Sequence, residues 1–130
     1  QTHLEQFYPP ESRHGFNVEK LLAQGVAFFL VREDTAPVAC GGILLVDGEY
    51  GELKRMYVRP EFRGRGFGKL LIEHLASYAR AHGISVLRLE TGIYQPEAIS
   101  LYEQAGFVRI PPFGPYTNDP LSLCYEKRLA

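Results

Sequence analysis

The pattern of hydrophobic and polar positions changes its period along the chain, and each period predicts a type of element. In the first half, apolar residues at helical spacing predict a short helix at 18–23, which Gly25 ends. Asp47-Gly48 predicts a hairpin turn. Three runs rich in β-branched and aromatic residues predict strands, at 26–31, 38–46 and 50–58.

The second half begins with the longest helical pattern. From Gly66 to His82, apolar residues recur at helical spacing, and Gly83 is placed to end the helix. Because its prolines oppose regular structure, the segment 111–120 is expected to be a loop. The remaining pattern predicts four elements: a strand at 85–91, a helix from Pro96 to Gly106, and strands at 107–110 and 121–129.

The first residues do not follow either period. Gln1 to Glu5 are polar and are interpreted as a helix-like stretch that leads to Pro9-Pro10. No internal repeat, linker or low-complexity segment divides the chain. We therefore expect one α/β domain over residues 1–130, built on a mixed sheet.

The composition narrows the class of protein. Of 130 residues, 45% are hydrophobic and 22% are charged, which is sufficient for a buried core. Fourteen Lys and Arg against fifteen Asp and Glu give a net charge of −1, which argues against a nucleic-acid-binding domain. No apolar run reaches the roughly 18 residues of a membrane helix, and the polar opening is unlike a signal peptide. The two cysteines, Cys40 and Cys124, form neither a disulfide framework nor a metal-ligand motif. We expect a soluble cytoplasmic protein without a metal.

The segment 58–71 carries the most specific chemistry, because it combines a strand end, a glycine-rich turn and the start of the long helix. Backbone N–H groups in such a turn lie at the positive end of the helix dipole and are suited to bind phosphate. The two-residue spacing of Gly64, Gly66 and Gly68 differs from a dinucleotide-binding fingerprint, and Leu70 after Lys69 excludes a Walker A loop. The alternative is a turn that only connects strand to helix.

The pattern Arg63-x-x-Gly66-x-Gly68 resembles the pyrophosphate loop of the GCN5-related N-acetyltransferases, the GNAT superfamily. The resemblance extends to three further segments, at 56–58, 89–91 and 101–107. Flanking pieces such as Cys40-Gly41-Gly42 and 51–54 resemble a bacterial subgroup of uncharacterised, YsnE-like acetyltransferases.

The resemblance implies a three-layer α/β fold. Its mixed, mostly antiparallel sheet would splay between the strands that end at Val58 and Thr91, with helices on both faces and acetyl-CoA in the gap. GNAT chains normally open on a strand before their first helix. Because this chain is interpreted as beginning in or just before that helix, we expect the opening strand to be missing.

The resemblance also implies which residues bind acetyl-CoA. The backbone of 56–58 would pair with the pantetheine arm, and that of 64–69 would surround the pyrophosphate. Gln95 stands where the family often has an asparagine that contacts pantetheine. The complete expected set is Met56, Tyr57, Val58, Arg63, Gly64, Arg65, Gly66, Phe67, Gly68, Lys69 and Gln95.

Acetyl transfer to an amine requires a base, because an alkylammonium must lose a proton before its nitrogen attacks. Glu52 and Glu90 are the candidates, since each stands among apolar strand residues and matches a position where branches of the superfamily carry a base. Glu52 is slightly preferred, because it precedes the acetyl-binding segment on the same strand. The alternative is a solvated or ion-paired glutamate, with Lys54 and Arg88 as partners.

The departing sulfur benefits from an acid, and the resemblance assigns that role to Tyr102. Its position on an apolar helix face also fits a tyrosine that only packs in the core. In the family, the first helices and the final loop enclose the acceptor. Ser12, His14 and Tyr116 are therefore candidate substrate-binding residues, with solvated loop polarity as the alternative.

The sequence thus predicts an N-acetyltransferase. It would move acetyl from acetyl-CoA directly to a primary amine of a small molecule or amino acid, through a tetrahedral intermediate with a glutamate base and a tyrosine acid. We expect no nucleic-acid or membrane partner, and homodimers are common in the family. A regulatory domain that binds acyl-CoA without transferring it is the alternative.

Overall fold

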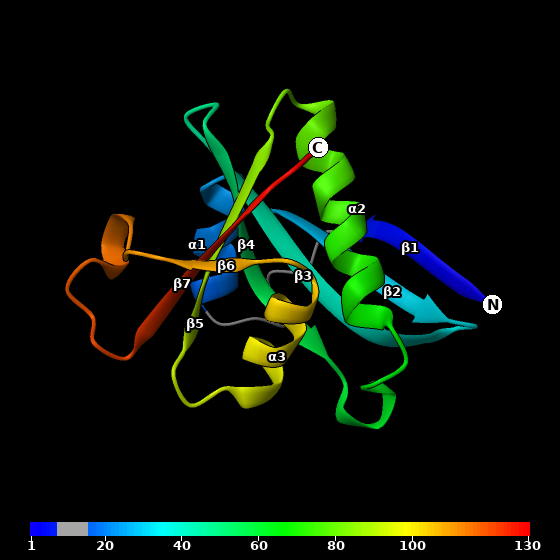
Figure 1. The fold of residues 1–130 in the computed structure, drawn as a ribbon. Helices are drawn as coiled ribbons and strands as arrows, with labels where there is room; N and C mark the ends of the chain where they lie inside the picture. Colours follow the sequence, from blue (N-terminus) through cyan, green and yellow to red (C-terminus); the bar gives the residue numbers. More distant parts are fainter. Residues whose placement is uncertain (8–15) are drawn as a thin grey trace.

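The computed structural model describes residues 1–7 and 16–130, and it places a seven-stranded sheet between helices (Figure 1). Figure 1 shows α2 and α3 on one face of the sheet and α1 on the other. No helix in the described ranges is long and apolar enough to cross a membrane. The elements are β1 (Thr2–Phe7), α1 (Phe16–Ala23), β2 (Ala27–Glu33), β3 (Ala36–Val46), β4 (Tyr50–Val58), η2 (Pro60–Phe62), α2 (Phe67–Ala81), β5 (Val86–Gly92), α3 (Pro96–Gln104), β6 (Val108–Ile110), η3 (Gly114–Tyr116) and β7 (Ser122–Arg128).

The strand order is β1-β2-β3-β4-β5-β7-β6, and every neighbouring pair is antiparallel except β4 and β5. These two parallel strands pair only near their starts, where Gly51 lies opposite Leu87 and Glu52 opposite Arg88. Beyond those pairs no ladder joins the strands, so they separate toward Val58 and Gly92. The mixed, mostly antiparallel sheet that splays between two central strands is confirmed.

The main core lies between the sheet and α2. Leu71 and Leu75 of α2 are fully buried against Val31, Ile43 and Leu87 of the sheet. Burial alternates strictly along β5, so Leu87 and Leu89 enter this core while the side chains between them face the other side. The opposite face therefore presents Glu90 toward the side of the sheet that α1 covers.

Two expectations about the opening residues are wrong. Residues 2–7 form β1, not a helix-like stretch, and the opening strand is present. β1 pairs antiparallel with β2 along its whole length. Most side chains of β1 are exposed, so its sequence lacks the alternation of apolar and polar residues that marks a strand. β1 is therefore a strand because it pairs with β2, not because of a local signal. In the loop 111–120, Pro115 sits in the first turn of η3, where its fixed φ favours a short helical turn.

A bulge in β4 determines which side chains face each side of the sheet. Cys40 of β3 pairs with Tyr57, whereas Gly42 pairs with Lys54, so β4 has one extra residue opposite Gly41. Arg55 lies at this bulge with a left-handed φ of 56°. Leu53, Met56 and Val58 all contact the core, and this shift of alternation leaves Lys54 and Arg55 together on the other side.

Candidate functional site

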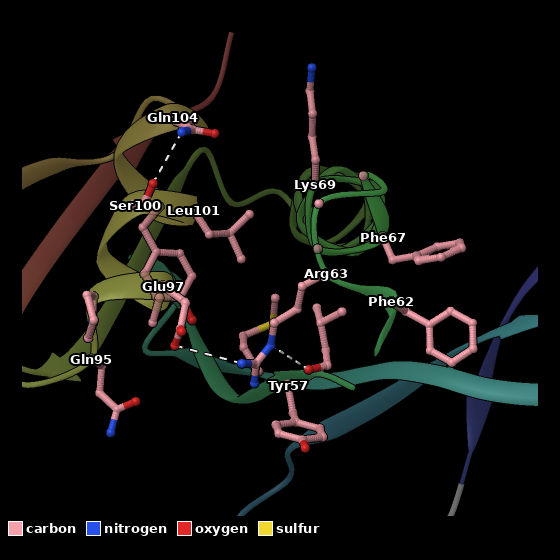
Figure 2. A pocket seen from close by; sticks show the side chains of 18 residues that line it. Tyr57, Phe62, Arg63, Phe67, Lys69, Gln95, Glu97, Ser100, Leu101 and Gln104 are labelled. Atoms are coloured by element: carbon pink, nitrogen blue, oxygen red, sulfur yellow. Dashed lines mark hydrogen bonds and ion pairs between the residues drawn. The ribbon is translucent and has the colours of Figure 1, made fainter. Parts of the chain in front are cut away.

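A cleft of about 710 Å³ opens where β4 and β5 separate; we call it the loop cleft. The end of β4, the glycine turn before α2 and one side of α3 form its walls (Figure 2). The lining includes every residue of the expected acetyl-CoA set except Arg65, namely Met56, Tyr57, Val58, Arg63, Gly64, Gly66, Phe67, Gly68, Lys69 and Gln95.

The backbone of the glycine turn is shaped to present N–H groups to this cleft. Gly64 and Gly66 adopt φ of 78° and 87°, a left-handed conformation that side chains disfavour. Gly66 is the N-cap of the 15-residue helix α2, and Leu70 donates the first intrahelical hydrogen bond, to the Gly66 carbonyl. The preceding N–H groups at 67–69 therefore have no intrahelical acceptor, which makes the turn a suitable anion site.

Close packing of α3 on this turn explains why residue 68 is a glycine. A Cβ atom at Gly68 would lie 2.9 Å from Cδ2 of Leu101, a residue that projects into the loop cleft (Figure 2). Any side chain at residue 68 would therefore displace the end of the Leu101 side chain. The glycine allows the cleft to be narrow at this point.

Arg63 spans the loop cleft. Its Nε donates a hydrogen bond of 3.1 Å to the Val58 carbonyl, and a terminal nitrogen lies 3.8 Å from a Glu97 carboxylate oxygen on α3 (Figure 2). The guanidinium also lies over the Tyr57 ring, 5.8 Å from its centroid. A carbonyl oxygen can accept two hydrogen bonds, so Val58 can still accept one from a ligand while Arg63 is bound to it.

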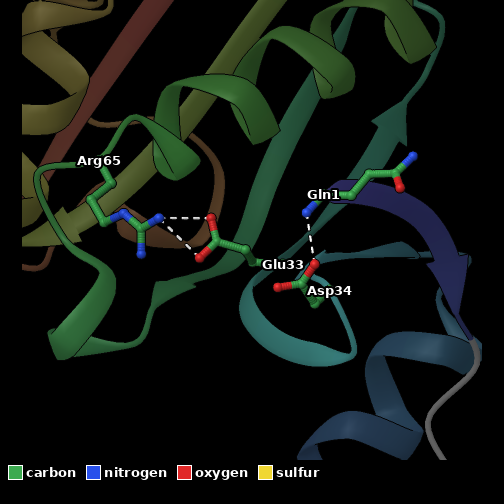
Figure 3. Close-up of polar contacts among 4 residues, drawn as sticks. All are labelled: Gln1, Glu33, Asp34 and Arg65. Carbon is green, nitrogen blue, oxygen red and sulfur yellow. Dashed lines mark hydrogen bonds and ion pairs between the residues drawn. The ribbon is translucent and has the colours of Figure 1, made fainter.

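The side chain of Arg65 lies outside the loop cleft. It forms two hydrogen bonds, of 2.9 and 2.7 Å, to the Glu33 carboxylate of β2 (Figure 3). Its guanidinium also covers the Phe67 ring at 5.2 Å. These contacts hold the glycine turn against the sheet, and in this conformation Arg65 offers only its backbone to the expected anion site.

A second, smaller cavity of about 320 Å³ lies between α1 and η3; we call it the carboxylate cavity. It is lined by Leu21, Glu52, Leu53, Lys54, Arg55, Glu90 and Tyr116. The cavity brings together both candidate bases and Tyr116, which are far apart in sequence. Arg55 was not expected in an acceptor site, and Lys54 entered only as an ion-pair partner. Residues two apart in a strand lie on the same face, so the sequence alone could have placed Lys54 beside Glu52 in this site.

Glu52 is the more deeply buried carboxylate, with 5% of its surface exposed. Its Oε2 accepts a 2.7 Å hydrogen bond from the Tyr116 hydroxyl and lies 3.1 Å from Nζ of Lys54. Lys54 also donates to the Tyr116 hydroxyl at 3.3 Å. Burial, followed by the hydrogen bond to Glu52, raises the pKa of Tyr116, so its hydroxyl remains a donor. This triad holds Glu52 in a fixed position and leaves Oε1 without these contacts.

Glu90 has a simpler environment. Its Oε2 accepts a 2.8 Å hydrogen bond from the buried hydroxyl of Ser122 on β7. The carboxylate lies on the side of β5 that faces the carboxylate cavity. Its partner is neutral, in contrast to the ammonium that contacts Glu52.

Tyr102 lines the loop cleft from α3 and is 94% buried, with 6% of its surface exposed. Its ring packs edge-on against Phe107, with centroids 5.8 Å apart. Burial raises its pKa to about 12, and the charge of Glu90 contributes to the increase. Glu90 lines the carboxylate cavity, whereas Tyr102 lines the loop cleft. Among the described residues, the Tyr102 hydroxyl has no hydrogen-bond partner and is not a fully buried atom.

Two expected residues, Ser12 and His14, lie outside the described part of the chain. Within that part, no group of three or more His, Cys, Asp or Glu side chains is arranged to hold a metal ion.

Comparison with known proteins gives consistent matches over nearly the whole chain. The sequence model of the Acetyltransferase (GNAT) family matches residues 1–107. A protein named IAA acetyltransferase from Azospirillum brasilense is 44% identical over 98% of this chain and 84% of its own length. The uncharacterised N-acetyltransferase YsnE of Bacillus subtilis is 34% identical over 93% and 82%.

Solved structures agree with these matches. A putative acyl-CoA N-acyltransferase from Klebsiella pneumoniae superposes with a TM-score of 0.84 and 32% identity, covering 99% of this chain and 98% of that one. A GNAT family acetyltransferase from Elizabethkingia anophelis with acetyl-CoA bound has a TM-score of 0.81 at 16% identity, with 98% of both chains covered. The second match concerns the fold alone.

Proposed function

The chain belongs to the GNAT acetyltransferase family, and on that premise we propose that it transfers acetyl from acetyl-CoA directly to a primary amine of a small molecule or amino acid. The observation that carries the proposal is the pair of cavities at the separation of β4 and β5. One has the backbone of an anion site, and the other has two carboxylates that can receive a cationic amine.

The residues of the loop cleft fit acetyl-CoA. The N–H groups at 67–69 and the left-handed Gly64 and Gly66 suit a pyrophosphate, and a volume of about 710 Å³ is within the usual range for ligand sites. The exposed backbone edge at 56–58 suits an extended pantetheine arm. When bound there, the cofactor supplies an activated acetyl thioester. In this proposal, backbone N–H groups at the end of β4 stabilise negative charge on the carbonyl oxygen.

We favour Glu90 as the base that takes the proton from the acceptor ammonium. Among the described residues its carboxylate accepts only from the neutral Ser122 hydroxyl, whereas Glu52 lies 3.1 Å from the Lys54 ammonium. Glu52 is held by Tyr116 and Lys54, and its Oε1 is suited to orient the ammonium. Tyr102 holds a proton at its hydroxyl and donates it to the leaving sulfur.

Thiol release tests the proposed function. Purified protein is given acetyl-CoA and a panel of primary amines, while free CoA thiol is followed by absorbance and acetylated amine by mass spectrometry. We expect amine-dependent thiol release above the rate without amine. CoA binding by calorimetry is measured in parallel. Tight CoA binding without release on any amine would instead support a regulatory domain that binds acyl-CoA.

Replacing Gly66 with valine should weaken CoA binding at least about tenfold, because a β-branched residue cannot hold the left-handed φ that orients the turn. Gly48→Val is the matched control, since Gly48 has a similar φ of 69° in a distant hairpin turn. We expect the control to lose comparable thermal stability but to keep its CoA affinity by calorimetry. A folded Gly66→Val protein with normal CoA affinity would place the anion site elsewhere.

A further inference from the structure

Arg55 occupies a backbone conformation that arginine disfavours. It is one of three non-glycine residues with positive φ in the described chain, and the other two, Asp34 and Asp47, lie in turns. Aspartate tolerates the left-handed region better than arginine does, whereas Arg55 lies inside strand β4. Such strained residues persist where the surroundings fix them, and they cluster at functional sites.

The bulge gives this strain a consequence for the carboxylate cavity. In a regular strand, Arg55 would lie on the same side as Leu53 and enter the core. The extra residue instead lets Met56 enter the core. Its sulfur occupies the space that a Cβ atom at Gly41 would need. Arg55 is thereby placed beside Lys54 as part of the cavity lining, and its side chain is exposed.

The charges of this lining are unevenly paired. Lys54 contacts Glu52 and Tyr116, and Glu90 accepts from the Ser122 hydroxyl. The guanidinium of Arg55 forms no hydrogen bond or ion pair with any residue in the described ranges, unlike Arg59, Arg63 and Arg65 on the following segment. The cavity therefore combines carboxylates that attract an ammonium with one cation available to an anion.

We propose, resting on the proposed function, that the acceptor is a small amino-carboxylate and that Arg55 binds its carboxylate while Glu52 and Glu90 face its amine. A guanidinium matches a carboxylate through two parallel N–H donors. An acceptor with an amine alone would leave Arg55 unpaired and would bring its own positive charge close to it. The volume of about 320 Å³ suits a molecule of amino-acid size.

Matched acceptor pairs test this inference. Each α-amino acid and each longer ω-amino acid is compared with its own carboxamide, which keeps the amine and the shape but removes the negative charge. The ω-amino acids are included because a carboxamide far from the amine barely changes the pKa of that amine. Rates of CoA thiol release give kcat/KM for both members. We expect the best acid to exceed its amide by at least about tenfold.

Arg55→Gly removes the guanidinium and accepts the left-handed φ without strain, so this variant should fold. It should lose the preference for acid over amide, mainly through a rise of about tenfold or more in KM for the acid, and Arg55→Lys should restore part of it. Arg128→Ala is the control, because Arg128 is 86% exposed and lies outside both cavities. It should keep the wild-type preference.

Three results would overturn the inference. Amides that react as well as their acids would show that no carboxylate is recognised. A preference for acids that survives in Arg55→Gly would assign the recognition to another residue. Both results leave amine acetylation intact, so they are distinct from failure of the proposed function, in which neither acids nor amides release thiol and both proposals fall.

Discussion

Tyr102→Phe is expected to lower kcat by about a hundredfold to ten-thousandfold, with little change in the melting temperature. The substitution keeps the ring that packs on Phe107 and removes a hydroxyl that has no partner among the described residues. Stability should therefore change little. The proton that the hydroxyl would give to the leaving sulfur is lost, which corresponds to about 3–5 kcal/mol of the barrier. The KM for acetyl-CoA should change much less.

The raised pKa of Tyr102 sets the pH dependence of this role. Since burial moves its pKa to about 12, the hydroxyl stays protonated from neutral pH to about pH 10. Tyr102 should then produce no alkaline decline of kcat in that range. Proton transfer to a thiolate with an ordinary pKa near 8.5 is uphill in water, but a poorly solvated thiolate in a narrow cleft has a stronger demand for the proton.

Two further variants separate catalysis from packing. Tyr102→Ala should cost about 3–5 kcal/mol of stability, because it leaves a cavity in the core. Tyr78→Phe removes a hydroxyl from another core-packed tyrosine, on α2 and outside both cavities, and should keep normal turnover. A Tyr102→Phe enzyme within about threefold of the wild-type kcat would make Tyr102 a packing residue only.

The sequence predicts most of the regular fold because its elements have clear local signals. The residues of β4 were predicted at both ends, and α2 begins one residue after Gly66 because that glycine caps it. β1 has no such signal. It is an exposed edge strand with polar side chains, and only the ladder to β2 defines it. The spacing of apolar residues along a segment does not reveal which distant segment it pairs with.

The sequence can name candidate site residues, but it does not give their contacts. Glu52, Glu90 and Tyr102 follow from motif positions, but the hydrogen bond from Tyr116 to Glu52 joins residues 64 positions apart. The side of the sheet on which Arg55 lies depends on the bulge in β4, and the alternation of residues along the strand does not reveal this bulge. The glycine turn predicts backbone donors from sequence alone, whereas the contact of Arg65 with Glu33 depends on the position of β2.

Glu90→Gln should reduce kcat/KM for the amine most strongly at low pH. An alkylammonium has a pKa of about 10, so near pH 7 roughly one molecule in a thousand is already deprotonated. A base is therefore most valuable there, and its loss should cost about a hundredfold or more. As the pH approaches the pKa of the amine, solvent supplies free amine and the deficit should shrink. Complete pH–rate profiles with one acceptor measure this trend.

Glu52→Gln provides the matched comparison, because both substitutions remove one negative charge from the same cavity. Glutamine at residue 52 can still accept from Tyr116 through its amide oxygen, so the triad should survive in part. If Glu52 only orients the ammonium, its loss should raise KM for the amine by a similar factor at every pH below the amine pKa. A deficit that shrinks with pH in Glu52→Gln, but not in Glu90→Gln, would exchange the two roles. If both variants keep the complete wild-type profile, neither carboxylate is the base and the proton passes directly to solvent.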